Sequence, residues 1–226
     1  IVATPIGNLG DITLRALETL KSVDFILCED TRHTQKILNH FEIKKPVIRY
    51  DEYTSEKIYE QILDRLKNGK KIALVTDAGT PGISDPGAKL VSYVISHLSS
   101  SKASSSLSSI IVPIPGPSAI TTALSASGIN ASQFTFLGYP PHKKGRETFF
   151  KNLKNTETRP IVFYESPHRV EKALNSLSAV FGENYEIVVA RELTKLHEEI
   201  FKGKITEAKL RFVNEHKKGE FVLIIP

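Results

Sequence analysis

The sequence predicts an α/β protein with two domains, a parallel sheet in the first domain and a mixed sheet in the second. In the first half, short apolar segments alternate with helix-like segments roughly every 20 to 25 residues, which is typical of parallel strands joined by crossover helices. In the second half the spacing is irregular and includes short, hairpin-like intervals, which favours a mixed sheet. The glycine-rich residues 75–87 follow one apolar segment directly and indicate where the chemistry lies.

Composition limits the kinds of protein that this chain can be. Its 226 residues can bury one large or two modest cores, and 40% hydrophobic with 24% charged residues is typical of a globular protein. No apolar run approaches the roughly 20 residues of a membrane span, and no signal peptide is visible. The single cysteine, Cys28, excludes an internal disulfide, so we expect a cytoplasmic protein without a membrane partner. The net charge of +5 permits an anionic partner without requiring one.

The first domain opens with a strand and a helix. Residues 1–4 are apolar and predict a strand that enters a turn-rich loop, residues 5–10. Asp11 is expected to cap the following helix, because a carboxylate can accept hydrogen bonds from the free N–H groups of a first turn. Leucines at every third position form the apolar face of that helix: Leu14, Leu17 and Leu20.

Two further strands are predicted before the glycine-rich loop. Residues 24–29 form a strand in which Cys28 packs beneath the sheet, and this strand ends in a polar cluster, residues 29–34. Residues 46–50 form the third strand, and Ser55 caps the helix that follows it. The polar cluster therefore lies at the carboxyl end of a strand.

The first domain is organised around residues 75–87. They follow a short strand, residues 71–74, and precede a helix-like segment, residues 88–95. Three glycines and two prolines within nine positions fix an irregular backbone and leave N–H groups free at the next helix start. Asp77 and Asp85 add acceptors for hydroxyl or ammonium groups of a ligand, which a plain connecting turn, the alternative, does not need.

Three of these loops are expected to meet at one edge of the parallel sheet: residues 5–10, 29–34 and 77–87. Ligands of α/β sheets bind beyond the carboxyl ends of the strands. The sequence therefore predicts a site for a small polar ligand at this edge.

The domain boundary is predicted near residue 115. The serine-rich residues 99–109 are expected to form a surface loop without chemistry, and residues 110–114 resume the sheet. A proline-glycine corner, residues 115–119, then starts a helix of small residues. The predicted domains are accordingly residues 1–115 and 116–226.

The second domain is predicted to contain a basic loop, two longer helices and five strands. The loop, residues 140–146, is stiffened by prolines. Ser166 and Pro167 are expected to start an amphipathic helix, and Thr206 a helix that runs to about His216. The predicted strands lie at residues 134–138, 159–165, 185–191, 200–205 and 220–225.

Several well-known motifs are absent from the sequence. The glycine spacings match neither the Walker loop of nucleotide triphosphatases nor the dinucleotide-binding fingerprint. The seven histidines show no metal-ligand spacing, and no nucleophile elbow occurs. We therefore expect neither a metal ion nor a covalent nucleophile.

Six motifs together resemble those of the tetrapyrrole methylase superfamily, in its branch that methylates ribosomal RNA. They keep the order of the family and extend over essentially the whole chain, so their coincidence is far more specific than any one of them. The serine-rich residues 99–109 depart from a compact family pattern. The motifs are residues 2–9 (VATPIGNL), 28–32 (CEDTR), 75–87 (VTDAGTPGISDPG), 115–119 (PGPSA), 163–169 (FYESPHR) and 190–195 (ARELTK).

This resemblance implies an activity, a cofactor and partners. It implies two α/β domains of the class III methyltransferase type, with S-adenosylmethionine in the cleft between them, and a homodimer. The implied reaction transfers a methyl group to the 2′-hydroxyl of a cytidine in the decoding region of 16S rRNA, free or within the small ribosomal subunit. The implied cofactor contacts are Pro5, Asp77, Gly79, Thr80, Ile83, Ser118, Ala119, Leu137, Tyr164, Ala190, Leu193 and Val222.

The implied reaction needs positioning and a base. A sulfonium methyl group is already activated, so an in-line displacement depends mainly on holding the methyl group near the ribose oxygen. A base that accepts the proton of the hydroxyl typically adds about 10²- to 10⁴-fold. Asp30 and Glu165 are favoured because each ends a predicted strand, although such loop charges are often only ion pairs. The candidates are Asp30, Glu165, Glu192, Lys195 and His197.

Basic side chains near the motifs are expected to contact RNA, since phosphate contacts position a protein on nucleic acid. A charge run in a turn is more often only solvated, which is the alternative for the basic loop. Candidates for RNA phosphates are Arg32, Arg169, Arg191 and Lys195, with Lys143, Lys144 and Arg146 at the rim of the RNA path.

Two other functions remain open at this point. A C-methyltransferase of the same fold acting on a tetrapyrrole, a precorrin or uroporphyrinogen, would need a wide apolar cleft, whereas the motifs here are charged. A cofactor-binding assembly or sensing factor would bind S-adenosylmethionine without forming an RNA product.

Overall fold

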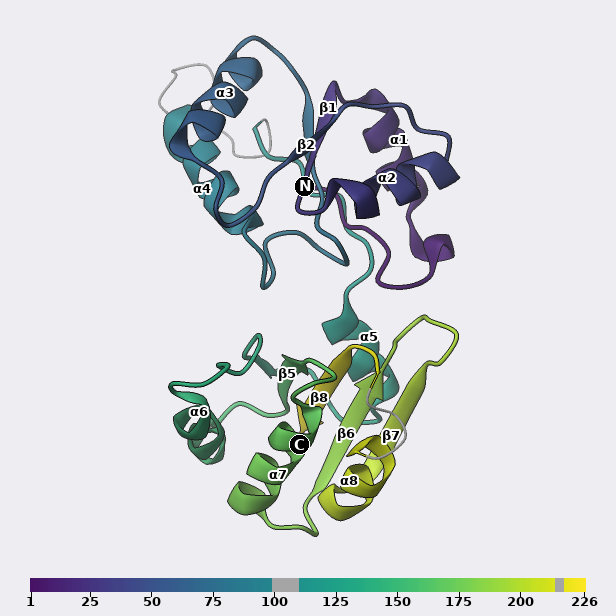
Figure 1. Ribbon diagram of the computed structural model, residues 1–226, viewed down its shortest axis with the longest axis vertical. Coiled ribbons are helices and arrows are strands. Elements are labelled where there is room, and N and C mark those ends of the chain that lie inside the picture. The colour runs from purple at the N-terminus through teal and green to yellow at the C-terminus, as the bar shows by residue number, and fades with distance from the viewer. Residues whose placement is uncertain (99–109, 214–217) are drawn as a thin grey trace. The chain divides into compact units, whose positions relative to one another are not determined.

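The structure, a computed structural model, describes residues 1–98, 110–213 and 218–226 (Figure 1). It contains two compact units, Ile1–Ser118 (unit 1) and Ala119–Pro226 (unit 2), each with its own sheet. The predicted α/β class is confirmed, with a parallel sheet in unit 1 and a mixed sheet in unit 2. The serine-rich segment predicted to be a surface loop lies outside the described residues.

Unit 1 is built on a three-stranded parallel sheet with the order β2-β1-β3. Its central strand is entirely buried, and Ile26 of that strand pairs with Val47 on one side and Ala73 on the other. The strands are β1 (Phe25–Cys28), β2 (Val47–Arg49) and β3 (Ile72–Leu74). The helices are α1 (Leu14–Ser22), α2 (Thr31–His40), α3 (Glu56–Lys67) and α4 (Gly87–Leu98), preceded by a 3₁₀ turn at Leu9–Asp11.

Both faces of this sheet are covered, because the side chains of β1 alternate between two cores. Ile26 and Cys28 pack in a cluster with α1 and α2, whereas Phe25 and Leu27 pack with α3 and α4. Figure 1 shows these helix pairs on opposite sides of the strands. Full burial of each such large apolar side chain contributes about 1.5–3 kcal/mol, so the apolar run selects a doubly covered strand.

Two predicted strands of unit 1 are reduced to single bridges. Among the described residues, one bridge, between Val2 and Ile114, joins residues 1–4 to residues 110–114. A second bridge joins Thr4 to Gly79. Prolines explain this difference, because a proline has no N–H group to extend a ladder. Such prolines are Pro5, Pro113 and Pro115.

The helices of unit 1 correct two further predictions. Thr13, not Asp11, caps α1, since its hydroxyl accepts from Ala16 N at 3.1 Å. Leu14 is 79% exposed, so the leucine repeat does not define the buried face. Helix α2 was not predicted: Asp30 caps it, and residues 31–34 belong to the helix rather than to a loop.

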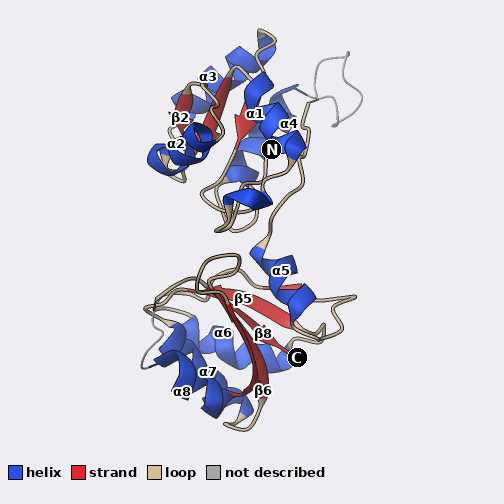
Figure 2. Ribbon diagram, turned by 90° about the vertical axis from the view of Figure 1, so that its right-hand side faces the viewer, coloured by secondary structure: helices blue, strands red, loops and turns tan. Residues whose placement is uncertain are grey.

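Unit 2 contains a five-stranded mixed sheet with the order β4-β5-β8-β6-β7 (Figure 2). Strands β4 and β5 are parallel, and the other neighbours are antiparallel. The strands are β4 (Thr135–Phe136), β5 (Ile161–Glu165), β6 (Glu186–Arg191), β7 (Glu199–Lys204) and β8 (Phe221–Ile225). The helices are α5 (Ala119–Ala126), α6 (Arg146–Asn152), α7 (Val170–Phe181) and α8 (Ile205–Val213), with a 3₁₀ turn at Leu153–Asn155.

The core of unit 2 lies between this sheet and the pair α7 and α8, which pack against each other. Phe221 and Leu223 of β8 point into it, together with Leu174 of α7 and Phe212 of α8. Helix α5 contacts β8 and lies on the other side of the sheet (Figure 2). The last strand of the chain is therefore central to the sheet and buried on both faces.

Three helices of unit 2 differ from the prediction. Helix α7 begins at Val170 after a turn, so Ser166 and Pro167 precede the helix rather than start it. Helix α8 begins at Ile205, and its predicted end near residue 216 lies outside the described residues. Helix α6 was not predicted. Among the described residues, no helix is long and apolar enough to cross a membrane.

Candidate functional site

Hydrogen bonds hold three loops of unit 1 together beyond the strand ends. Thr4 and Gly79 exchange backbone hydrogen bonds of 2.9 and 3.1 Å. The hydroxyl of Thr4 also donates to the carbonyl of Thr76 at 3.0 Å, and that of Thr80 donates to the carbonyl of Pro117 at 3.2 Å. The loops after residues 4, 76 and 115 thus form one assembly, as the parallel topology predicts.

Gly79 lies within this assembly. Its φ of +87° lies in the left-handed region, which favours glycine. A Cβ atom there would lie 3.4 Å from Cγ2 of Ile6 and 3.6 Å from the carbonyl oxygen of Pro117. These are ordinary van der Waals distances, so the left-handed φ rather than a lack of space favours glycine here, whereas the sequence suggested that the missing side chain admits a ligand.

The polar cluster after β1 is tied to the same loops. The backbone N–H of Asp30 donates to Oδ1 of Asp77 at 3.1 Å, and the hydroxyl of Thr76 donates to Oε1 of Glu29 at 2.6 Å. Burial raises the pKa of Glu29, and the nearby carboxylates of Asp77 and Asp85 act in the same direction, although the Thr76 hydroxyl opposes them. Glu29 is thus a half-buried carboxylate whose only hydrogen bond given by the described residues comes from a hydroxyl.

A cavity of about 1050 Å³ opens at this edge of unit 1. It is lined by the ends of all three strands and the start of α4, and its lining is predominantly charged or hydroxylic. The sequence analysis missed the part that β2 supplies, although the same strand-end argument applied there. The lining includes Glu29, Asp30, Arg32, Arg49, Asp51, Tyr53, Asp77, Ser84, Asp85 and Lys89.

Asp30, a predicted base, is engaged in local structure. Its carboxylate accepts from the backbone and Nε of Arg32 through Oδ1 and from NH2 of Arg32 through Oδ2, at 2.7–3.1 Å. These bonds hold the pKa of Asp30 well below its usual range and raise that of Arg32. A carboxylate with so low a pKa is a weak proton acceptor, while the side chain of Arg32 remains 87% exposed.

In unit 2, several predicted cofactor contacts form one row across neighbouring strands. Val222 of β8 pairs with Tyr164 of β5 on one side and Ala190 of β6 on the other, and Leu137 N donates to Val162 O next to them. The ring of Tyr164 packs between those of Phe136 and Tyr139, at 5.0 and 5.2 Å. Burial raises the pKa of Tyr164 to about 12, so this row is apolar and uncharged. Ala190 is fully buried, and its backbone lies between β7 and β8 in the sheet.

Glu165, the other favoured base, binds two arginines. Its carboxylate is fully buried and accepts from NH2 of Arg146 at 2.7 Å, from the backbone of Ser166 at 2.7 Å, and pairs with Nε of Arg169 at 3.0 Å. The two arginine side chains are only 13% and 14% exposed. Glu165, Arg146 and Arg169, all three predicted as site residues, therefore form one buried cluster.

Lys195 lies in an ion-pair network at the ends of β6 and β8. Its ammonium contacts Glu192 at 2.9 Å and Glu220 at 2.8 Å, while Arg191 pairs with Glu199 at 3.5 Å. Burial lowers the pKa of Lys195, but these carboxylates outweigh it and raise the value overall. Glu192 has a left-handed φ of +50°, a strained conformation that often marks functional loops. Among the other candidates, His197 is exposed.

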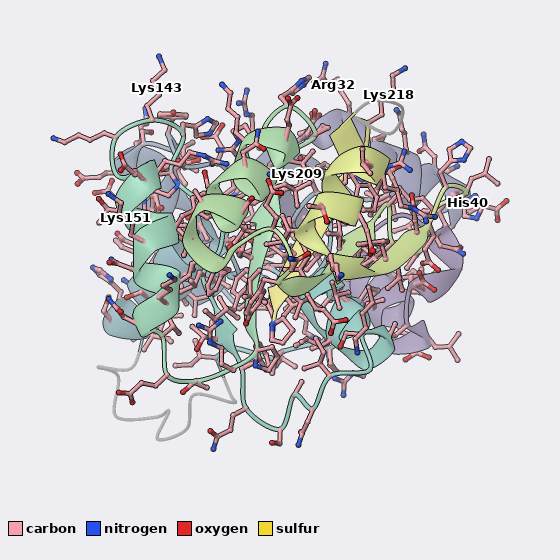
Figure 3. All side chains as sticks on the ribbon, turned by 90° about the horizontal axis from the view of Figure 1, so that it is seen from below. Arg32, His40, Lys143, Lys151, Lys209 and Lys218 are labelled. Atoms are coloured by element: carbon pink, nitrogen blue, oxygen red, sulfur yellow. The ribbon has the colours of Figure 1, made fainter. Side chains whose placement is uncertain are left out.

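The structure brings only some of the predicted cofactor contacts together: Gly79 and Thr80 in the joined loops of unit 1, and the row of Leu137, Tyr164, Ala190 and Val222 in unit 2. In unit 1, Ile83 is 49% exposed. Lys143 and Lys144 are exposed on the loop before α6, and Figure 3 shows Lys143 projecting outward. The contacts in unit 1 are Pro5, Asp77, Gly79, Thr80, Ile83 and Ser118, and those in unit 2 are Ala119, Leu137, Tyr164, Ala190, Leu193 and Val222.

The fold and the loops define an α/β protein of the kind that binds a small polar ligand beyond its strand ends. Residues 1–209 match the family of Tetrapyrrole (Corrin/Porphyrin) Methylases. The chain is 46% identical, over its full length and 96% of the relative, to the ribosomal RNA small subunit methyltransferase I of Thermotoga maritima. It is 43% identical to the protein of that name from Bacillus subtilis, covering 73% of it. The chain belongs to the tetrapyrrole methylase family.

Solved structures of this fold are similar to the chain as well. A cobalt precorrin-4 methyltransferase of cobalamin biosynthesis aligns with a TM-score of 0.71 and 16% identity, over 99% of this chain and 92% of the other. A uroporphyrin-III-C-methyltransferase from Thermus thermophilus aligns with a TM-score of 0.64 and 15% identity, with the same coverage. At these identities the likeness shows the fold alone.

S-adenosylmethionine is the methyl donor of this family, and each unit by itself holds groups whose chemistry suits part of that molecule. The Asp77 carboxylate is suited to accept from ribose hydroxyls or an ammonium group, and the row around Tyr164 offers an apolar surface to a purine ring. Among the described residues, no group of three or more histidine, cysteine, aspartate or glutamate side chains is arranged to hold a metal ion.

Proposed function

We propose that this chain is an S-adenosylmethionine-dependent methyltransferase that methylates the 2′-hydroxyl of a cytidine in the decoding region of 16S rRNA. The observation that carries the proposal is the charged and hydroxylic cavity of unit 1, lined by Glu29, Asp77 and Arg32. Its carboxylates suit the hydroxyl groups of a ribose, and Arg32, Arg49 and Lys89 are the cationic groups of the lining that a phosphate could contact. Full-length identity to relatives named as small-subunit rRNA methyltransferases supports the same substrate class.

The chain supplies orientation for the transfer. When bound, S-adenosylmethionine provides an electrophilic methyl group. The loop of Gly79 and Thr80 is hydrogen-bonded to Thr4 and Pro117 and forms a rigid side of the site. Asp77 orients hydroxyl or ammonium groups of the ligand. Pre-organised loops of this kind lower the entropic cost of an in-line approach.

Glu29 is the best-placed residue to accept the ribose proton. It lines the cavity, and within the described part of the chain it makes no ion pair with a lysine or arginine. Its raised pKa makes it a better proton acceptor than Asp30, whose pKa is depressed by Arg32. We therefore propose Glu29, and not its neighbour Asp30, as the base.

The other predicted catalytic residues fit positioning roles. Asp30 caps α2 and fixes Arg32, whose exposed guanidinium can reach a phosphate. Glu165 orders Arg146 and Arg169, and Lys195 joins the ends of β6 and β8 through two carboxylates. Arg191 is buried and donates to the carbonyl of Lys218, so it acts on RNA only through the shape of this region.

The proposal includes partners and a location. A homodimer acting on small ribosomal subunits in the cytoplasm follows from the resemblance and from the proposed substrate. Gel filtration with light scattering tests the dimer.

The alternative, C-methylation of a tetrapyrrole, is supported only by the fold. A large planar macrocycle needs broad apolar walls, whereas the cavity of unit 1 is charged. Incubation with methyl-labelled S-adenosylmethionine and, separately, small ribosomal subunits, free rRNA and uroporphyrinogen tests the choice. We expect label in RNA and none in the porphyrin; label in the porphyrin alone would overturn the proposal.

A further inference from the structure

A groove lined by lysines runs between α6 and α7 in unit 2. Its cavity volume is about 600 Å³. Phe150, which is 1% exposed, and the side chains of Ala179 and Val180 give it an apolar floor. Figure 3 shows Lys143 and Lys151 projecting outward from this region. The basic residues that line the groove are Lys143, Arg146, Lys151, Lys154 and Lys172.

The positive charge of this groove is poorly balanced. Glu147 is its only acidic lining residue, and it pairs with Lys151 at 2.6 Å where both side chains are more than two-thirds exposed. Such exposed pairs are weak and exchange readily for another anion. Within the described residues, Lys143, Lys154 and Lys172 make no ion pair with a carboxylate. The groove therefore keeps at least three cationic groups available to an anionic partner.

The shape of the groove suits a chain of phosphates rather than a single anion. It starts at Arg146, which Glu165 fixes at the carboxyl end of β5, and it extends along α6 to Lys154. The seven residues of α6 are about 10 Å long, at 1.5 Å per residue. A groove of this length can contact more than one phosphate of a nucleic-acid strand, whereas a single anion would need only one binding point.

We propose that the groove between α6 and α7 binds the sugar-phosphate backbone of the substrate RNA away from the methylated nucleotide. This inference rests on the proposed function and adds a docking surface to it. Lysine ammonium groups neutralise phosphates without reading sequence, and the apolar floor accommodates the sugar edge. The surface thus contributes affinity and orientation, not chemistry.

A triple variant tests the groove: Lys151→Gln, Lys154→Gln and Lys172→Gln together. A matched control removes three exposed lysines of unit 1 that line neither cavity, Lys21→Gln, Lys57→Gln and Lys67→Gln. Both variants change the net charge equally. Methylation of small ribosomal subunits is measured at several salt concentrations, and equilibrium binding of the subunits and of S-adenosylmethionine is measured separately.

We expect the groove variant to raise KM for subunits about tenfold or more, with kcat and cofactor affinity unchanged. The slope of log affinity against log salt should fall by about three, one for each lost phosphate contact. Equal slopes for groove variant, control and wild type would overturn the inference even if methylation proceeds. A different outcome would overturn the proposed function and leave the groove in place. In that case the wild-type protein binds RNA and the groove variant shows the expected change in slope, but the wild-type protein does not methylate the RNA.

Discussion

Glu165 gives the sharpest stability prediction, because one fully buried carboxylate holds two arginines. The change Glu165→Gln keeps the size of the side chain and removes its charge. Arg146 and Arg169 then face a neutral amide, and the amide NH2 group is a donor directed at another donor. The two guanidinium groups, at 13% and 14% exposure, cannot fully return to water.

The size of the effect follows from these contacts. Removing one partner of a buried ion pair costs about 3–5 kcal/mol, because the remaining charge is left uncompensated. Hydrogen bonds to charged groups contribute about 1.5–3 kcal/mol each, and Glu165 accepts two, from Arg146 and from the backbone of Ser166, besides its ion pair with Arg169. Partial exposure of the arginines lets water compensate in part. We therefore expect a loss of about 3 kcal/mol in the free energy of unfolding of unit 2.

Hydrogen exchange measures this loss where it should occur. The whole chain is compared with the variant by mass spectrometry, and peptides from β5, β6 and β8 report on unit 2 while β1 reports on unit 1. Glu147→Gln is the control, since its pair with Lys151 is exposed and should contribute little to stability. Equal protection of β5 in both variants, or a loss only in β1, would refute the reasoning.

Three further predictions concern unit 1. The change Gly79→Val should raise the Kd for S-adenosylmethionine about tenfold, or about 1.4 kcal/mol, because the γ carbons of valine would extend toward Ile6 and Pro117. The control Gly69→Val places the same side chain at a φ of +77° with no atom within 4 Å of its Cβ. The Kd of this control, measured by calorimetry, should be unchanged. The acid limb of kcat/KM should lie above the ordinary pKa of glutamate, because burial raises the pKa of Glu29 and only the ionised form acts as the base. The change Glu29→Gln should remove that limb and lower kcat about 10²-fold or more. An unchanged pH profile in this variant would exclude Glu29 as the base. Thr13→Ala should destabilise unit 1 by about 1 kcal/mol in urea titrations, whereas Asp11→Ala should change little; the opposite order would restore Asp11 as the cap.

The strands of unit 1 could be predicted where local sequence decides the outcome. Phe25–Cys28 is a short apolar run, and such a run fits only a strand buried on both faces. Helix α2 was missed although its buried residues, Thr34, Ile37 and Leu38, follow the i, i+3, i+4 spacing of one helix face. Its cap, Asp30, was present in the sequence, but the surrounding charges favoured a loop.

The candidate site likewise has features that the sequence could predict and features that it could not. The position of loops beyond the strand ends predicted that residues 5–10, 29–34 and 77–87 meet, and the bonds between Thr4 and Gly79 and from Asp30 to Asp77 agree with it. The partners of the charged residues could not be predicted, because they depend on packing. Arg146 reaches Glu165 across 19 positions of sequence, and no local pattern distinguishes that buried pair from an exposed base.

The chemical identity of the methylated nucleotide tests the central claim most directly. Small ribosomal subunits are incubated with the protein and methyl-labelled S-adenosylmethionine, and the rRNA is then digested to nucleosides and separated by mass spectrometry. The account predicts that the label is recovered as 2′-O-methylcytidine from 16S rRNA. Label recovered only in a base methyl group, or in no RNA nucleoside at all, would contradict it.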